Sequence, residues 1–99
     1  MPNRNYQKGA RREYQVIKIL LEEGYNGVSC VEAQRTAGSH GVFDVVAIME
    51  TGAVYLIQVK SDTADDELWK LEALPVQPPN KKLQFHFHFR MGYEVKEVK

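Results

Sequence analysis

The sequence predicts an α/β protein, a small mixed β-sheet flanked by helices, with elements in the order α-β-β-β-α-β-β. Two features support this fold class. Apolar residues recur at helical spacing near the N-terminus, and short β-branched or alternating runs follow, separated by glycine and proline. Since 99 residues is near the usual size of one domain, we expect a single domain over residues 1–99.

A helix is expected over residues 7–23, after a loose leader at residues 1–6. Its apolar side chains form one stripe: Ala10, Tyr14, Ile17 and Leu21. That stripe should pack on the sheet, and Gly24 is suited to end the helix. Glu13 lies on the side of the helix that should be buried, where a carboxylate needs a partner or a chemical role.

Three strands are expected next, at residues 25–35, 42–49 and 53–61. A loop of small residues, 36–41, separates the first two strands. The second and third should pair as a hairpin about a turn at residues 50–52. Antiparallel pairing about that turn places Asp44 opposite residue 59 or 60.

The remaining elements are a short helix at 65–74, a loop at 75–82, a strand at 82–90 and an edge strand at 93–98. In the strand, Gln84, His86 and His88 alternate with apolar residues and should face away from the core. Two alternating histidines do not complete a metal site, so we expect solvent or an interface over them. Trp69 and the leucines of the short helix are expected in the core, with a dimer contact as the alternative.

The formal net charge is +0, so the total gives no sign of a nucleic-acid partner. Basic residues concentrate in 1–20 and acidic residues in 62–72, which indicates either a phosphate-facing side or two solvated surfaces. Cys30 is the only cysteine, so we expect a buried thiol, no intrachain disulfide and a reducing, cytoplasmic setting. We expect neither a signal peptide nor a membrane span.

Four polar residues interrupt apolar elements and can meet at the open end of the hairpin: Glu13, Asp44, Gln58 and Lys60. Two carboxylates, an amide oxygen and the backbone carbonyl of Val59 are ligands suited to Mg²⁺. Lys60 would lie beside the metal-bound water and a phosphate. For any one residue an ordinary ion pair or hydrogen bond is the simpler interpretation, but the group together favours a metal site.

The stretches KGARREYQVIKILLEEGY, RTAGSHGVFDVVAI and VYLIQVKS resemble the PD-(D/E)xK nuclease superfamily over about residues 8–61. Within it, they most resemble the archaeal-type Holliday-junction resolvases and their phage and viral relatives. The resemblance implies a restriction-endonuclease-like fold and a cytoplasmic endodeoxyribonuclease of prokaryotic, archaeal, phage or viral origin. It also implies Mg²⁺, with Mn²⁺ as a substitute, and a homodimer that nicks opposed strands of four-way junctions in DNA recombination and repair.

The resemblance also implies residue roles. Glu13 would be the helix acid, Asp44 the main metal ligand, Lys60 the motif lysine and Ser39 the loop serine near the scissile phosphate. Gln58 stands at the second acidic position, where glutamate is usual. The residues expected to contact DNA are Arg4, Lys8, Arg11, Arg12, Arg35 and His40. Two alternatives remain open: another nicking or repair nuclease of this fold, or a junction-binding module that lost catalysis.

Overall fold

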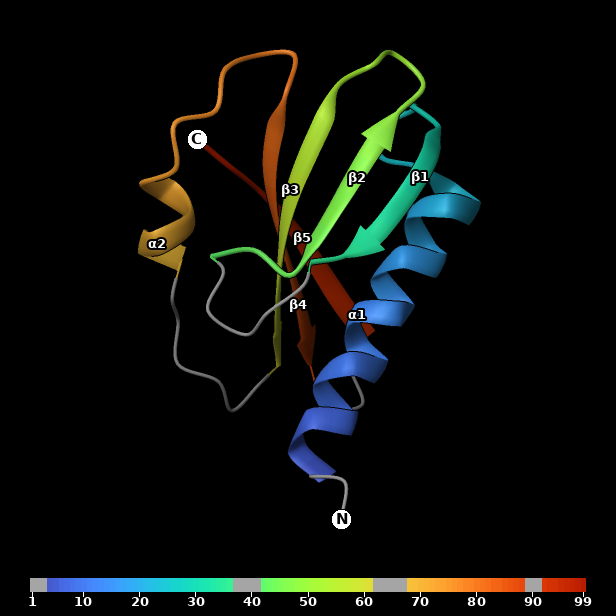
Figure 1. Cartoon of the computed structure of the whole chain (residues 1–99), viewed down its shortest axis with the longest axis vertical. Coiled ribbons are helices and arrows are strands. Elements are labelled where there is room, and N and C mark those ends of the chain that lie inside the picture. Colours follow the sequence, from blue (N-terminus) through green and yellow to red (C-terminus); the bar gives the residue numbers. More distant parts are fainter. Residues whose placement is uncertain (1–3, 37–41, 62–67, 89–91) are drawn as a thin grey trace.

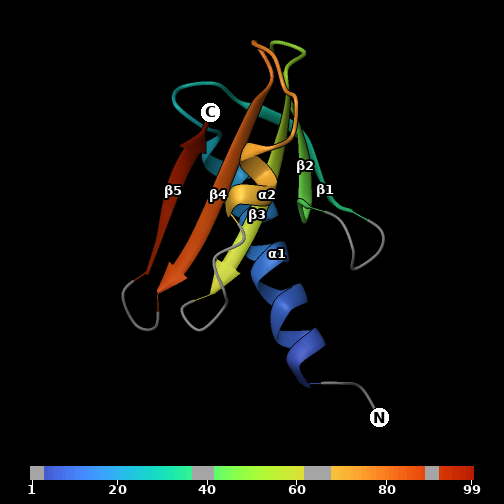
Figure 2. The same ribbon diagram turned by 90° about the vertical axis from the view of Figure 1, so that its left-hand side faces the viewer.

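The computed structural model describes residues 4–36, 42–61, 68–88 and 92–99. Its elements are α1 (Arg4–Glu23), β1 (Cys30–Arg35), β2 (Val45–Met49), β3 (Val54–Ser61), α2 (Leu68–Glu72), β4 (Lys81–His88) and β5 (Gly92–Val98). Figure 1 and Figure 2 show one five-stranded sheet with α1 and α2 on opposite sides. The predicted α/β fold class and element order are therefore confirmed.

The strands lie side by side in chain order, from β1 to β5. All neighbours pair antiparallel except β3 and β4, which pair parallel across the connection that contains α2. Val45 pairs with Ile57, which sets Asp44 opposite position 58. The predicted partner of Asp44, residue 59 or 60, is wrong, because pairing about Thr51, the centre of the predicted turn, places Asp44 opposite residue 58.

Several element boundaries also differ from the prediction; β2, for example, begins at Val45 instead of residue 42. α1 begins at Arg4, so residues 4–6 are helical instead of forming part of a loose leader. β1 begins only at Cys30, because Asn26 and Gly27 both have positive φ and turn the chain before the strand starts. Cys30 packs against the core but stays partly exposed, since it lies at the start of an edge strand.

The buried face of α1 is rotated from the predicted stripe. Val16 and Leu20 have no exposed area, whereas Tyr14 is 59% exposed and Leu21 is 49% exposed. The helix carries two overlapping apolar stripes, and the one that includes the aliphatic Val16 and Leu20 packs on the sheet. Tyr14 tolerates exposure because its hydroxyl can stay hydrated. No described helix, α1 included, is long and apolar enough to cross a membrane.

The main core lies between α1 and one face of the sheet. The strand residues that fill it are Val45, Ala47, Met49, Tyr55, Ile57, Leu83, Phe85 and Phe87. Because side chains alternate along a strand, the intervening residues point to the other face, on the side of α2. There Lys82 is 5% exposed, and its Nζ donates 2.9 Å hydrogen bonds to the carbonyls of Glu72 and Leu74. Those bonds satisfy carbonyl groups at the end of α2.

α2 is shorter than the predicted helix and buries less. It spans Leu68–Glu72, and residues 65–67 lie outside the described residues. Leu71 is completely buried, but Trp69 is 66% exposed, so its predicted place in the core is wrong. Positions two apart point to opposite sides of a helix, so Leu71 and Trp69 cannot both face the sheet.

Candidate active site

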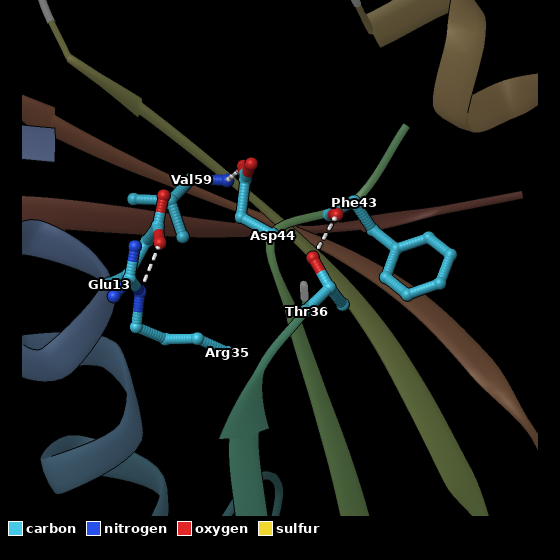
Figure 3. Close-up of polar contacts among 6 residues, drawn as sticks. All are labelled: Glu13, Arg35, Thr36, Phe43, Asp44 and Val59. Carbon is cyan, nitrogen blue, oxygen red and sulfur yellow. Dashed lines mark hydrogen bonds and ion pairs between the residues drawn. The ribbon is translucent and has the colours of Figure 1, made fainter. Parts of the chain in front are cut away.

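Asp44 is fixed at the open end of the hairpin by its backbone and its side chain (Figure 3). Its N–H donates to the Ile57 carbonyl at 2.7 Å, and its carbonyl accepts from the Thr36 N–H at 3.0 Å. Its carboxylate Oδ2 accepts a hydrogen bond from the Val59 N–H at 2.9 Å. These contacts hold the carboxylate against β3 at the point where β2 begins.

Val59 and Lys60 bring a carbonyl and a cation to the same strand end. In an extended strand the N–H and C=O of one residue point to the same side. The Val59 carbonyl therefore points to the side of β3 from which Asp44 approaches. Lys60 follows directly and shares a sheet face with Gln58, two residues before it. An acid, a carbonyl and an ammonium thus come from neighbouring positions.

Glu13 takes part in an ion pair that joins α1 to β1 (Figure 3). Its Oε1 lies 2.7 Å from Nε of Arg35, and the two side chains are 19% and 26% exposed, respectively. The Arg35 guanidinium also lies 5.1 Å from the centroid of the Tyr14 ring. Glu13 was predicted on the buried side of the helix, and the structure places it there with 19% of its side chain exposed; Arg35 is the partner that compensates its charge.

Gln58 is only 2% exposed, and both ends of its amide have partners. Its Nε2 donates to the Val42 carbonyl at 3.2 Å, and its Oε1 accepts from Nε2 of Gln84 at 2.8 Å. A backbone carbonyl can only accept, so this bond fixes which end of the Gln58 amide faces Val42. The opposite end must then be the oxygen, and Gln84 must be its donor.

A family model described as the archaeal Holliday junction resolvase (Hjc) matches residues 4–76. The match covers more than half of the chain, from α1 through α2, and includes Glu13, Asp44, Gln58 and Lys60. The chain belongs to the Hjc family. The suspected resemblance is therefore confirmed, and the family places this chain among nucleases of Holliday junctions. No curated protein matches the chain in sequence.

Three of the basic residues predicted to contact DNA have described side chains. Arg11 is exposed on α1, and Arg35 is held by Glu13. The Arg12 guanidinium lies 4.8 Å from the ring centroid of Phe87, so this arginine packs over β4. The other residues named from the sequence lie outside the described side chains: Arg4, Lys8, Ser39 and His40.

Sequence reasoning missed two residues that shape this Hjc-family site. Gln84 was expected on an outward face, yet it is 7% exposed, and α2 packs against β4 on that face. The available signal for Gln84 was the amide of Gln58, which needs a hydrogen-bond partner if it is buried. The position of that partner depended on the parallel β3–β4 register. Thr36 donates from its hydroxyl to the Phe43 carbonyl at 3.1 Å and so anchors the chain next to Asp44.

The oxygen donors at this strand end are few. Among the described residues, no three histidine, cysteine, aspartate or glutamate side chains are grouped as metal ligands. Mg²⁺ at phosphate sites is nevertheless commonly held by one or two carboxylates, with water and substrate oxygens completing its shell. Asp44 and the Val59 carbonyl fit that pattern. The Glu13 carboxylate on α1 and the Gln58 amide oxygen are the other two oxygen donors that the sequence predicts as ligands.

Proposed function

We propose that this Hjc-family chain is a metal-dependent, structure-selective DNA endonuclease that resolves four-way junctions by nicking opposed strands. The observation that carries the proposal is the position of the Asp44 carboxylate. Its Oδ2 lies 2.9 Å from the backbone nitrogen of Val59, and Val59 directly precedes Lys60 on β3. An acid, a backbone carbonyl and a lysine at one strand end supply what phosphodiester hydrolysis needs: ligands for a cation and a positive charge for the phosphate. Asp44 and Lys60 stand at the Asp and Lys positions of the PD-(D/E)xK pattern, with Gln58 at the position of the second acid.

Each residue has a separate role in this reaction. Asp44 and the Val59 carbonyl would hold Mg²⁺, and Mn²⁺ would substitute. When bound, the ion polarises the phosphate and favours hydroxide over water as the nucleophile. Lys60 offsets the negative charge that develops on the phosphoryl oxygens. Glu13, oriented by Arg35, assists the ion or its water.

Ser39 and the basic residues are proposed to position the DNA. Ser39 would contact the scissile phosphate. Arginine, lysine and histidine side chains on phosphates give affinity that depends on salt but carries no sequence information. The proposed phosphate contacts are Arg4, Lys8, Arg11, Arg12, Arg35 and His40.

Gln58 distinguishes this site from the usual motif. Its carbonyl oxygen has two lone pairs, and Gln84 occupies one of them. We propose that this oxygen also ligates the ion, as a neutral ligand in place of a carboxylate. Since one negative charge is lost, Mg²⁺ should bind more weakly than it would beside glutamate. The same amide supports the second candidate function, a junction-binding module without catalysis.

A homodimer is proposed because a two-fold junction cut symmetrically requires two sites related by a two-fold axis. The surface offers apolar side chains that an interface would cover. Val31 is 66% exposed and Ile48 is 41% exposed, on the edge pair β1–β2. Light scattering should then give twice the mass of one chain.

The decisive experiment uses a labelled four-way junction and a linear duplex of the same sequence, with Mg²⁺, Mn²⁺ or EDTA. We expect paired nicks in opposed strands of the junction, absent with EDTA and absent in Asp44→Asn. Cleavage of flaps or duplex instead would indicate another nuclease of this fold. Tight junction binding without cleavage in either metal, and no heat of metal binding, would select the non-catalytic module.

A further inference from the structure

The motif lysine has a neighbour on β4 to which no role has yet been assigned. The parallel β3–β4 register pairs Gln58 with Gln84 and Lys60 with His86. The Gln84–Gln58 hydrogen bond shows that the first pair lies on one sheet face. Two residues further along both strands the side chains return to that face, so Lys60 and His86 are neighbours there. Neighbouring strands are about 4.8 Å apart.

His86 belongs to a defined cluster rather than to a scattered polar surface. Its ring stacks on that of His88, with ring centroids 4.4 Å apart and planes 29° apart. Nε2 of His88 lies 3.4 Å from Oε2 of Glu94, and Glu94 is the register partner of His86 on β5. Figure 2 shows these ends of β3, β4 and β5 side by side. The groups around His86 on described elements are thus Lys60, His88 and Glu94.

The exposure of the cluster suits contact with a ligand. The opposite face of β4 fills the core, with Phe85 1% and Phe87 4% exposed. His86 and His88 are only partly buried, and the His88 side chain is 29% exposed. The two imidazoles and the ammonium at this position can each donate an N–H to an anion such as a phosphate oxygen.

We propose that His86 donates a hydrogen bond to a DNA backbone phosphate adjoining the one at Lys60, so that β4 extends the DNA-contact surface. His88 acts as a positioning residue, since its ring stacks on His86 and its Nε2 lies 3.4 Å from the Glu94 carboxylate. This inference rests on the proposed function, because it takes the scissile phosphate to lie at Lys60. It predicts that junction binding weakens when the His86 imidazole is removed.

The test is the affinity of the full chain for a labelled four-way junction in EDTA, measured over a series of salt concentrations. We expect His86→Ala to weaken binding about tenfold. His86→Lys, which keeps a donor for the phosphate, should keep tight binding. His88→Gln should weaken binding less than His86→Ala does.

Lys18→Ala is the matched control, since it removes an exposed positive charge from α1, which packs on the opposite face of the sheet from His86. It should lower affinity much less than His86→Ala does. Equal junction affinity of wild type and of a folded His86→Ala would overturn the inference while leaving resolution of junctions intact. A wild-type chain that binds no branched DNA would overturn the proposed function and the inference together. Circular dichroism and thermal unfolding of each variant check that it is folded.

Discussion

Gln84 on β4 donates a 2.8 Å hydrogen bond to the side-chain oxygen of Gln58 on β3. Gln58 is 2% exposed and Gln84 is 7% exposed, so the bond lies in the interior. It continues through the Gln58 amide nitrogen to the Val42 carbonyl. A neutral chain of hydrogen bonds therefore links the segment before β2 to β3 and β4, at the position where the family pattern has an acid.

We predict that Gln84→Ala destabilises the fold. It leaves the Gln58 oxygen buried without its donor, which should lower the free energy of unfolding by about 1–3 kcal/mol. Urea denaturation measures this, and Gln77→Ala, at an exposed position, should change stability by less than about 0.5 kcal/mol. Replacing both Gln58 and Gln84 with leucine should cost less than the two single changes combined, since neither polar group is then left alone.

We also predict that Gln58→Glu couples stability to the metal. A carboxylate has no N–H for the Val42 carbonyl, and its charge would be buried in a site 2% exposed. Without metal, thermal unfolding should occur at a lower temperature than in wild type. Added Mg²⁺ should recover part of that loss, and calorimetry should show tighter Mg²⁺ binding. An equal effect of Mg²⁺ on wild type and variant would show that position 58 does not face the ion.

A third prediction concerns the ion pair between α1 and β1. Arg35→Gln leaves the Glu13 carboxylate largely buried without a cation, which should destabilise the protein by about 2 kcal/mol. Glu13→Gln in the same background should restore much of that stability, because the unpaired charge is gone. A double-mutant cycle in urea measures the coupling. Coupling near zero would mean that solvent, rather than Arg35, compensates Glu13.

The fold class could be predicted from the sequence because helical and strand periodicities are local. Glu13, Asp44, Gln58 and Lys60 were also recognisable, since polar residues stand out within apolar runs. The β3–β4 strand register and the buried face of α1 could not be predicted in the same way. The register depends on the connection through α2, and the buried face depends on which of two overlapping apolar stripes of α1 packs on the sheet. Gln84 was missed for that reason, because an alternating strand predicts outward polar residues wherever no helix covers them.

The last prediction contrasts two residues of α2. Trp69 is 66% exposed and Leu71 is completely buried. Leu71→Ala should therefore destabilise the fold by about 2–4 kcal/mol through the cavity it leaves, whereas Trp69→Ala should cost less than about 1 kcal/mol. As the only tryptophan, Trp69 also reports its own surroundings, and iodide should quench its fluorescence strongly. Protection that disappears on dilution would instead place Trp69 in a contact between two copies of the chain.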